Sequence, residues 1–264
     1  MSLELGLSDL AVEVAQEAGE LARRRRAEGV HLAATKSSIA DIVTEADREV
    51  EALIRARLLA ARPDDGFLGE ESAPDEGATG ITWVVDPIDG TVNYAYGIPS
   101  YAVSIAAVRG SVVPGEWEAL AGAVYGPAGG DLFHAARGHG AYLGDVRLSV
   151  TAETAAGALL ATGFGYDPST HDGDLATVRR VMTMARDLRR SGSAALDLAF
   201  VAAGRLDGYF ERGLKPWDLA AGALLVAEAG GQVSLIDTDS ARPMLIAGGT
   251  QVHDRLRGIV EEES

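Results

Sequence analysis

Apolar residues recur at helical spacing in two segments within the first sixty positions of the chain. Apolar side chains recur every three or four residues between positions 10 and 22, which predicts an amphipathic helix. Ser8 is expected to cap its start and Gly29 to end it. A second helix is expected to begin at Thr44 and to end before Pro63, because proline disrupts a helix interior. The apolar positions that define these helices are Leu10, Val14, Ala18 and Leu21, then Val50, Leu53, Ile54 and Leu58.

The pattern changes after position 80. As far as residue 150, short β-prone runs alternate with turns that contain glycine or proline, which predicts an antiparallel sheet. Beyond residue 155, strand-like runs alternate with helical segments. The expected strands cover 81–85, 101–108, 121–125, 131–135, 158–162, 207–211, 233–236 and 244–247, and the expected helices cover 175–187, 194–203, 219–229 and the C-terminus.

No linker or low-complexity stretch separates the two halves. With 264 residues, 47% of them hydrophobic, the chain is long enough for a substantial core. We therefore expect a single domain over residues 1–264, made of two intimately packed subdomains that divide near residues 150–155. The expected fold is of the α+β or α/β class, a layered αβαβα sandwich with an antiparallel sheet in the first half and a mixed sheet in the second. The functional site is expected in the seam.

Charge and composition narrow the function. The chain has 23 basic and 39 acidic residues and a formal net charge of −16, which disfavours nucleic acid or an anionic membrane as a partner. Cysteine is absent, so disulfides, thiol nucleophiles and thiolate metal sites are excluded. Acidic residues interrupt the early apolar positions, so no secretory signal is expected. The longest apolar stretch, Leu219–Ala227, is too short to span a bilayer. We expect a cytoplasmic protein.

The most informative segment is the run of residues 83–91. An apolar strand ends there in two carboxylates, Asp86 and Asp89, and then in a glycine and a threonine. Because Pro87 disfavours helix at the preceding residue, the chain is expected to turn sharply, so that both carboxylates converge with the Ile88 carbonyl. The backbone that follows would offer N–H groups to an anion. Pro-x-Asp-Gly is also ordinary turn chemistry, so this segment alone leaves both a metal site and a simple turn open.

Other acidic positions also have simple structural explanations. Glu70 and Glu71 fit a solvent-exposed acidic loop that follows a short β-prone run. Asp218 falls in the first turn of an expected helix, where a carboxylate complements the helix dipole. Thr44 and Asp47 have the spacing of a capping box. As a set, however, these residues are hard oxygen ligands of the kind that Mg²⁺ prefers.

Four motifs follow one another along the chain: Asp41-Ile-Val-Thr44-Glu-Ala-Asp47, Gly69-Glu70-Glu71-Ser72, Trp83-Val-Val-Asp86-Pro-Ile-Asp89-Gly90-Thr91-Val-Asn93 and Trp217-Asp218-Leu-Ala-Ala-Gly222. In this order they closely resemble the inositol monophosphatase family. The resemblance extends from the first helix to the last strands. It implies a Mg²⁺-dependent phosphatase that acts on a small phosphate ester.

The resemblance assigns the metal ligands residue by residue. It implies that one Mg²⁺ binds Glu70, Asp86 and the Ile88 carbonyl. A second is expected to bind Asp86, Asp89 and Asp218, and a third, looser ion to lie near Glu70. Packed carboxylates repel one another when no cation is present, so such a cluster makes chemical sense with ions bound. Two cations can also clamp the attacking and leaving oxygens of an in-line displacement.

The remaining site residues follow from the same resemblance. Asp47 and Thr91 are expected to orient and activate the attacking water, with Glu70 as a third catalytic residue. The backbone of Gly90 and Thr91 is expected to hold the phosphate. The expected substrate-binding set is Asp89, Gly90, Thr91, Gly192, Ser193, Ala194, Glu211 and Asp218. Two further matching positions that are expected to support the site are Lys36 and Asp41.

Glu211 indicates the kind of substrate. A carboxylate accepts hydrogen bonds from hydroxyl groups and repels a second phosphate, which favours an uncharged polyol with one phosphate, such as inositol 1-phosphate. Histidinol phosphate, fructose 1,6-bisphosphate and 3′-phosphoadenosine phosphate stay open as alternative substrates. An alternative of another class is a regulatory binding protein whose hydrolysis is incidental. The resemblance further implies a homodimer, Mn²⁺ as a substitute for Mg²⁺, and inhibition by Li⁺ or Ca²⁺.

Overall fold

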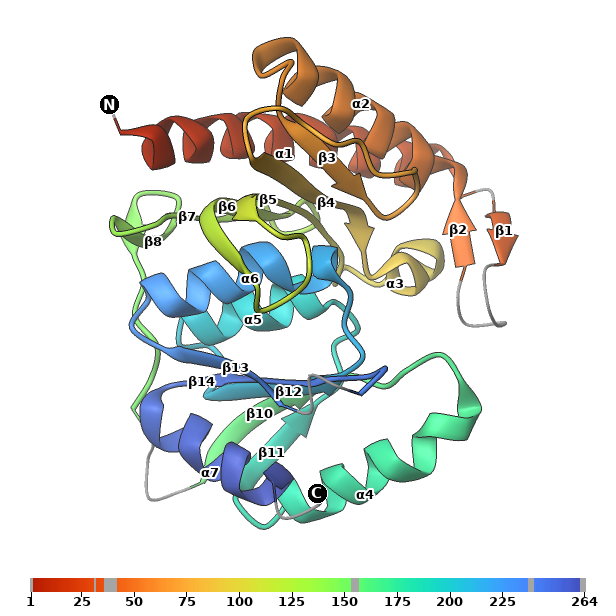
Figure 1. Cartoon of the computed structure of the whole chain (residues 1–264). Coiled ribbons are helices and arrows are strands. Elements are labelled where there is room, and N and C mark those ends of the chain that lie inside the picture. The colour runs from red at the N-terminus through yellow and green to blue at the C-terminus, as the bar shows by residue number, and fades with distance from the viewer. Residues whose placement is uncertain (1, 31, 36–41, 153–156, 237–239, 262–264) are drawn as a thin grey trace.

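The computed structural model describes residues 2–30, 32–35, 42–152, 157–236 and 240–261. Its helices in this part of the chain are α1 (Leu3–Glu28), α2 (Glu45–Ala61), α3 (Thr91–Tyr96), the 3₁₀ turn η1 (Pro168–Thr170), α4 (His171–Val181), α5 (Ala194–Ala202), α6 (Pro216–Glu228) and α7 (Thr250–Glu261). Figure 1 shows five layers: α1 with α2, a first sheet, α5 with α6, a second sheet, and α4 with α7. The expected αβαβα sandwich is confirmed.

The first sheet is almost entirely antiparallel, as predicted. It has seven strands in the order β3-β4-β5-β6-β7-β8-β9, and only β3 and β4 run parallel. Its strands are β3 (Gly66–Gly69), β4 (Ile81–Asp89), β5 (Ala102–Gly110), β6 (Trp117–Gly126), β7 (Asp131–Ala136), β8 (Gly140–Leu143) and β9 (Val146–Arg147). A short antiparallel pair, β1 (Leu32–Thr35) and β2 (Ile42–Thr44), precedes α2.

The second sheet is mixed, also as predicted. Its five strands have the order β11-β10-β12-β14-β13, with β11, β10 and β12 parallel and β12, β14 and β13 antiparallel. Its strands are β10 (Ala158–Thr162), β11 (Ala185–Arg189), β12 (Gly208–Arg212), β13 (Gln232–Ile236) and β14 (Met244–Gly248). The chain therefore passes from one sheet to the other between β9 and β10.

Small residues let α5 and α6 pack tightly between the two sheets. Gly222 of α6 faces Leu198 of α5, and a Cβ built at Gly222 would lie 2.6 Å from the Leu198 Cβ. On the other side of α6, a Cβ at Gly122 of β6 would lie 3.0 Å from the Ala221 Cα. Because interiors pack this closely, neither helix can shift without a clash. The N-terminal ends of α5 and α6 are thereby fixed in the seam, where site residues were expected.

Two sequence-based expectations about elements were wrong. The first helix begins at Leu3 and Ser2 caps it, whereas Ser8 is buried within the helix. The apolar face continues back to Leu7, so the helix already begins at Leu3 instead of after Ser8. The segment 175–187 is not one helix, because α4 ends at Val181 and the strand β11 follows. That edge strand is mostly exposed, so its sequence lacks the apolar alternation that would reveal it.

None of the helices in the described part of the chain is both long and apolar enough to cross a lipid bilayer.

Candidate active site

A β-bulge in β4 brings two aspartates to one face of the first sheet. Asp86 pairs with Ser104 and Asp89 with Ala102, so three steps along β4 match two steps along β5. In a regular strand, residues three apart point to opposite faces, and one extra residue restores the same face. The Ile88 N–H turns back to donate a 3.1 Å hydrogen bond to Asp86 Oδ1. The convergence that the sequence predicted is present, although a bulge produces it and the strand continues through Asp89.

Glu70 lies beside Asp86 because β3 and β4 are parallel. Gly69, the last residue of β3, is in register with Val85, so the next residue of each strand is Glu70 and Asp86. Burial raises the pKa of Asp86 and of Asp218, and the negative charge of Glu70 raises both further. Glu70 is therefore a close electrostatic neighbour of both aspartates.

Asp218 reaches the same point from the second half of the chain. It lies in the first turn of α6, where Pro216 begins the helix, and its Oδ2 accepts a 2.7 Å hydrogen bond from the Lys215 backbone N–H. This capping contact orients the carboxylate. The predicted structural role at a helix start is confirmed, and it coexists with a place in the acidic cluster.

Asp86, Asp89 and Asp218 form the centre of that cluster. One carboxylate oxygen from each lies within 4.8 Å of the others, a spacing that can hold a metal ion. Burial raises the pKa of all three, and the neighbouring negative charges raise those of Asp86 and Asp218 further. For Asp89 the value reaches about 6. Three carboxylates and the adjacent Glu70 form a set of hard oxygen donors that fits a divalent cation and offsets its charge.

Thr91 and Asp47 connect this cluster to α2. The Thr91 hydroxyl lies 3.3 Å from Asp47 Oδ1 and 3.0 Å from the Ile88 carbonyl oxygen, and its single proton can serve one acceptor at a time. Asp47 is fully buried and accepts hydrogen bonds from the Thr44 N–H and hydroxyl, at 2.7 and 2.5 Å. The capping box that the sequence predicted is confirmed. Burial raises the pKa of Asp47 to about 6.

Gly90 and Gly192 bring the two halves of the chain into contact. Gly90 has φ +90° and precedes α3, and a Cβ there would lie 3.0 Å from the Gly192 carbonyl oxygen. Only glycine tolerates both this conformation and this proximity. The Asn93 amide then ties the two loops together, because its Nδ2 donates to the carbonyls of Ser100 and Ser191, each at 2.7 Å. The sequence motif that contains Asn93 gave no indication of these two hydrogen bonds.

Ser193 and Ala195 hold Asp89 in place from the second half. Asp89 Oδ2 accepts a 2.6 Å bond from the Ser193 hydroxyl and a 2.7 Å bond from the Ala195 N–H. Together with the Ala194 N–H, these donors partly offset the effect of burial on the pKa of Asp89. Ser193 also caps α5, since its Oγ accepts from the Leu196 N–H. Sequence reasoning expected Ser193 and Ala194 to contact substrate, and it missed that the start of α5 orients Asp89.

Glu211 lies at the end of β12 and is paired with a tyrosine. The Tyr209 hydroxyl donates a hydrogen bond to Glu211 Oε2. Burial raises the pKa of Glu211 to about 7, and the positive charge of Arg190 acts in the opposite direction. Asp197 of α5 is close enough for Glu211 and Asp89 to raise its pKa, which burial brings to about 7. Sequence reasoning missed Tyr209, Arg190 and Asp197, and no spacing pattern links them.

A pocket of about 400 Å³ adjoins this cluster. Gly90 and Gly192 form the wall that it shares with the acidic site, and its other lining residues come from α3, loop 163–167, α4 and the residue that follows β11. Two positions that the sequence placed near the site, Lys36 and Asp41, lie outside the described residues.

Comparison with known proteins agrees with this geometry. The model of the inositol monophosphatase family matches residues 6–262. The chain belongs to this family. Its members are metal-dependent phosphatases and hydrolyse phosphoric monoesters.

The relatives cover nearly the whole chain. Inositol-1-monophosphatase SuhB of Mycobacterium tuberculosis strain H37Rv is 45% identical, covering 97% of this chain and 91% of that protein. Nus factor SuhB of Escherichia coli K12 is 42% identical over 86% of this chain and 84% of its own. Among solved structures, extragenic suppressor protein SuhB from Bartonella henselae superposes with a TM-score of 0.86 at 38% identity, covering 95% of this chain and 96% of that one.

Proposed function

We propose that the protein hydrolyses inositol 1-phosphate, or a closely related polyol monophosphate, with Mg²⁺ as its metal. One observation carries the proposal: Asp86, Asp89 and Asp218 converge within 4.8 Å, with Glu70 close enough to raise the pKa of two of them. The proposed ligands are these four carboxylates and the Ile88 carbonyl, shared among two or three ions. Mn²⁺ is proposed as a substitute, and Li⁺ or Ca²⁺ as inhibitors.

Each side chain has a task that its position allows. Bound Mg²⁺ would neutralise charge on the phosphate and acidify a water molecule. Thr91, held between Asp47 and the Ile88 carbonyl, is placed to accept a hydrogen bond from that water and to orient it. Asp47 positions Thr91 by accepting a hydrogen bond from its hydroxyl group. The backbone N–H groups of Gly90 and Thr91 are proposed to bind phosphate oxygens at the start of α3.

The leaving alcohol is proposed to lie against the second half of the chain. Gly192, Ser193 and Ala194 form the loop that enters α5, and Glu211 supplies a carboxylate for hydroxyl groups. Tyr209 fixes the direction of that carboxylate. A polyol with several hydroxyls satisfies these acceptors, whereas a second phosphate would meet the negative charges of Glu211 and Asp89.

A substrate panel tests the proposal directly. Phosphate release would be measured with inositol 1-phosphate, histidinol phosphate, fructose 1,6-bisphosphate and 3′-phosphoadenosine phosphate, with Mg²⁺ and with chelator. We expect kcat/KM to be highest for inositol 1-phosphate and turnover to vanish with chelator. A preference for either bisphosphate would refute the polyol assignment.

A second candidate is a regulatory binding protein. Two relatives, from Haemophilus influenzae and E. coli, carry the name Nus factor SuhB, at 40% and 42% identity. The formal net charge of −16 disfavours direct binding to nucleic acid, so a protein partner or a homodimer would be the binding mode. The Asp86→Asn variant separates the two roles. If hydrolysis is the main role, turnover falls by at least about 10³-fold while the circular dichroism spectrum stays unchanged. A folded wild-type protein without turnover on any ester would favour the binding role.

A further inference from the structure

The pocket beside the acidic cluster has a largely apolar wall. Val92 of α3 lies on one side, and Phe164, Tyr166 and Leu175 lie on the other. Its volume of about 400 Å³ is within the range of sites that take drug-sized ligands, about 300–1,000 Å³. Glu211, the proposed contact for polyol hydroxyls, is not among the residues that line it. The pocket therefore lies next to the proposed polyol position, and its wall is largely apolar instead of acidic.

Two of these apolar side chains are unusually exposed. Tyr166 keeps 45% of its surface exposed and Leu175 keeps 53%. Both border a concave space that opens onto the shared wall of Gly90 and Gly192. Exposed apolar surface gathered in a concavity is typical of a ligand site, whereas scattered apolar residues are normal on any surface. A ring that entered the pocket would remove this surface from water.

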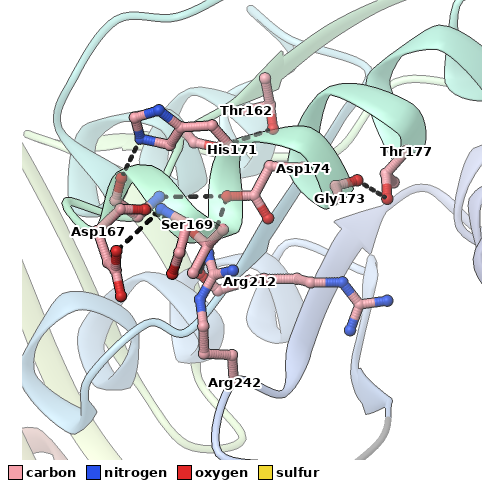
Figure 2. A network of polar contacts seen from close by, with 12 residues as sticks. Thr162, Asp167, Ser169, His171, Gly173, Asp174, Thr177, Arg212 and Arg242 are labelled. Atoms are coloured by element: carbon pink, nitrogen blue, oxygen red, sulfur yellow. Dashed lines mark hydrogen bonds and ion pairs between the residues drawn. The ribbon is translucent and has the colours of Figure 1, made fainter.

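A polar network fixes the wall that carries these side chains. Figure 2 shows Asp174 of α4 beside Arg242, which precedes β14; their ion pair measures 2.9 Å. Asp174 is 7% exposed and also accepts a 3.4 Å bond from the Gly165 N–H. His171 closes the loop, because its Nε2 donates to the Gly165 carbonyl at 2.9 Å. The loop between β10 and α4 is therefore held before any ligand arrives, which reduces the ordering cost of binding.

Arg190 brings a positive charge to this pocket, next to the negatively charged acidic cluster. Arg190 lines it, and a Cβ built at Gly192 would lie 2.8 Å from an Arg190 guanidinium nitrogen. The charge of Arg190 also acts on Glu211 and Asp197. A planar guanidinium can stack on a ring or donate to an acceptor on it. The pocket thus combines apolar contacts with the guanidinium group of Arg190.

From these observations we infer that the enzyme accepts phosphate esters whose alcohol carries an aromatic ring, and that the ring occupies the pocket of Val92, Phe164, Tyr166 and Leu175. An acceptor or anionic group on the ring would face Arg190. This inference rests on the proposed function, since the phosphate of such an ester is placed at the same acidic cluster. It extends the substrates from polyols to arylalkyl alcohols.

The test compares esters with the same kind of leaving group. Ethyl phosphate and 2-phenylethyl phosphate both release a primary alcohol, so a difference in kcat/KM reports on the ring. We expect at least a tenfold preference for 2-phenylethyl phosphate, in line with the selectivity of apolar pockets. Leu175→Asn should reduce that preference at least fivefold. A carboxyl group at the ring's para position should raise kcat/KM further, and Arg190→Gln should abolish this extra gain.

A matched control removes an apolar side chain outside the pocket. Met182 follows α4 and is 46% exposed, similar to Leu175, so Met182→Ala should leave the preference unchanged. Equal kcat/KM for the two esters, or a preference that Leu175→Asn retains, would overturn the inference. Failure of the proposed function looks different, because neither inositol 1-phosphate nor ethyl phosphate would then be hydrolysed. In that case calorimetry with 2-phenylethylphosphonate and ethylphosphonate decides: at least tenfold tighter binding of the former is expected, and equal binding refutes the pocket.

Discussion

The Ser193 hydroxyl donates a 2.6 Å hydrogen bond to Asp89 Oδ2 across 104 positions of the chain. The bond joins the end of β4 in the first sheet to the start of α5 in the layer between the sheets. Both groups are buried, and the Ala195 N–H adds a second donor to the same oxygen at 2.7 Å. One oxygen of Asp89 is thus committed to protein contacts, so the other is free to face the acidic cluster.

Replacing Ser193 by alanine should weaken metal binding. Loss of a group that orients a metal ligand typically costs about 10–100-fold in affinity, so we expect a shift of this size in the Kd for Mg²⁺ or Mn²⁺. Calorimetric titration measures it. Ser149→Ala, which removes an exposed hydroxyl far along the chain, is the control. Unchanged affinity in Ser193→Ala would show that the bond does not orient Asp89.

Thr91 should be sensitive to the loss of its hydroxyl and tolerant of the loss of its methyl group. Because the hydroxyl lies between Asp47 and the Ile88 carbonyl, Thr91→Val should lower kcat by about 100-fold, whereas Thr91→Ser should stay within a few fold of wild type. Phosphate release under saturating inositol 1-phosphate gives both values. Equal losses in the two variants would point to packing instead of the hydroxyl.

Substrate preference should depend on the ionisation of Glu211. Burial raises the pKa of this group to about 7, so the carboxyl gains its charge, and becomes a stronger acceptor, as the pH rises through that value. The ratio of kcat/KM for inositol 1-phosphate to that for ethyl phosphate should therefore increase between pH 6 and pH 8. In Glu211→Gln the ratio should be about tenfold lower and independent of pH. A Gln variant with the wild-type ratio and pH profile would remove Glu211 from substrate recognition.

Without metal, the folded protein should lose stability as the pH rises. Burial raises the pKa values of Asp47 and Asp89 to about 6 in the folded state, above the ordinary aspartate value of 3.8. Between those values the folded state binds more protons than the unfolded state, so the free energy of unfolding falls with increasing pH. In a chain of this size each kcal/mol shifts Tm by about 2–4 °C.

Thermal unfolding in chelator at pH 5.5 and 7.5 measures this effect. We expect a lower Tm at pH 7.5, and a larger rise in Tm on adding Mg²⁺ there than at pH 5.5, because the ion competes with protons for the same carboxylates. Asp86→Asn removes one repelling carboxylate, so it should flatten the pH dependence in chelator. A Tm in chelator that rises toward pH 7.5 would contradict the raised pKa values.

How much of this could be read from the sequence depends on whether a contact is local. Thr44 and Asp47 form a capping box within four residues, and Asp218 lies in the first turn of α6. Both features depend only on neighbouring residues, so both were predicted correctly. The convergence of Asp86 and Asp89 was also predicted. The β-bulge that causes this convergence was not predicted, because it appears only when β4 is paired with β5.

Contacts between distant segments could not be predicted from periodicity. Nothing in the local pattern around Ser193 reveals that its hydroxyl meets Asp89, and nothing around Asn93 reveals the Ser191 carbonyl. The strand β11 was missed for a related reason, since an exposed edge strand depends on its partner β10 and not on an apolar repeat of its own. Resemblance to a family supplied the expected site residues, and the structure shows which contacts position them.

Anomalous scattering from a crystal grown with Mn²⁺ tests the central claim most directly. The claim is that Glu70, Asp86, Asp89 and Asp218 meet because they hold divalent ions. The account predicts anomalous peaks within about 2.0–2.3 Å of oxygens of Asp86, Asp89 and Asp218, with a further ion at Glu70. A well-ordered crystal in saturating Mn²⁺ with no peak between these carboxylates would contradict it.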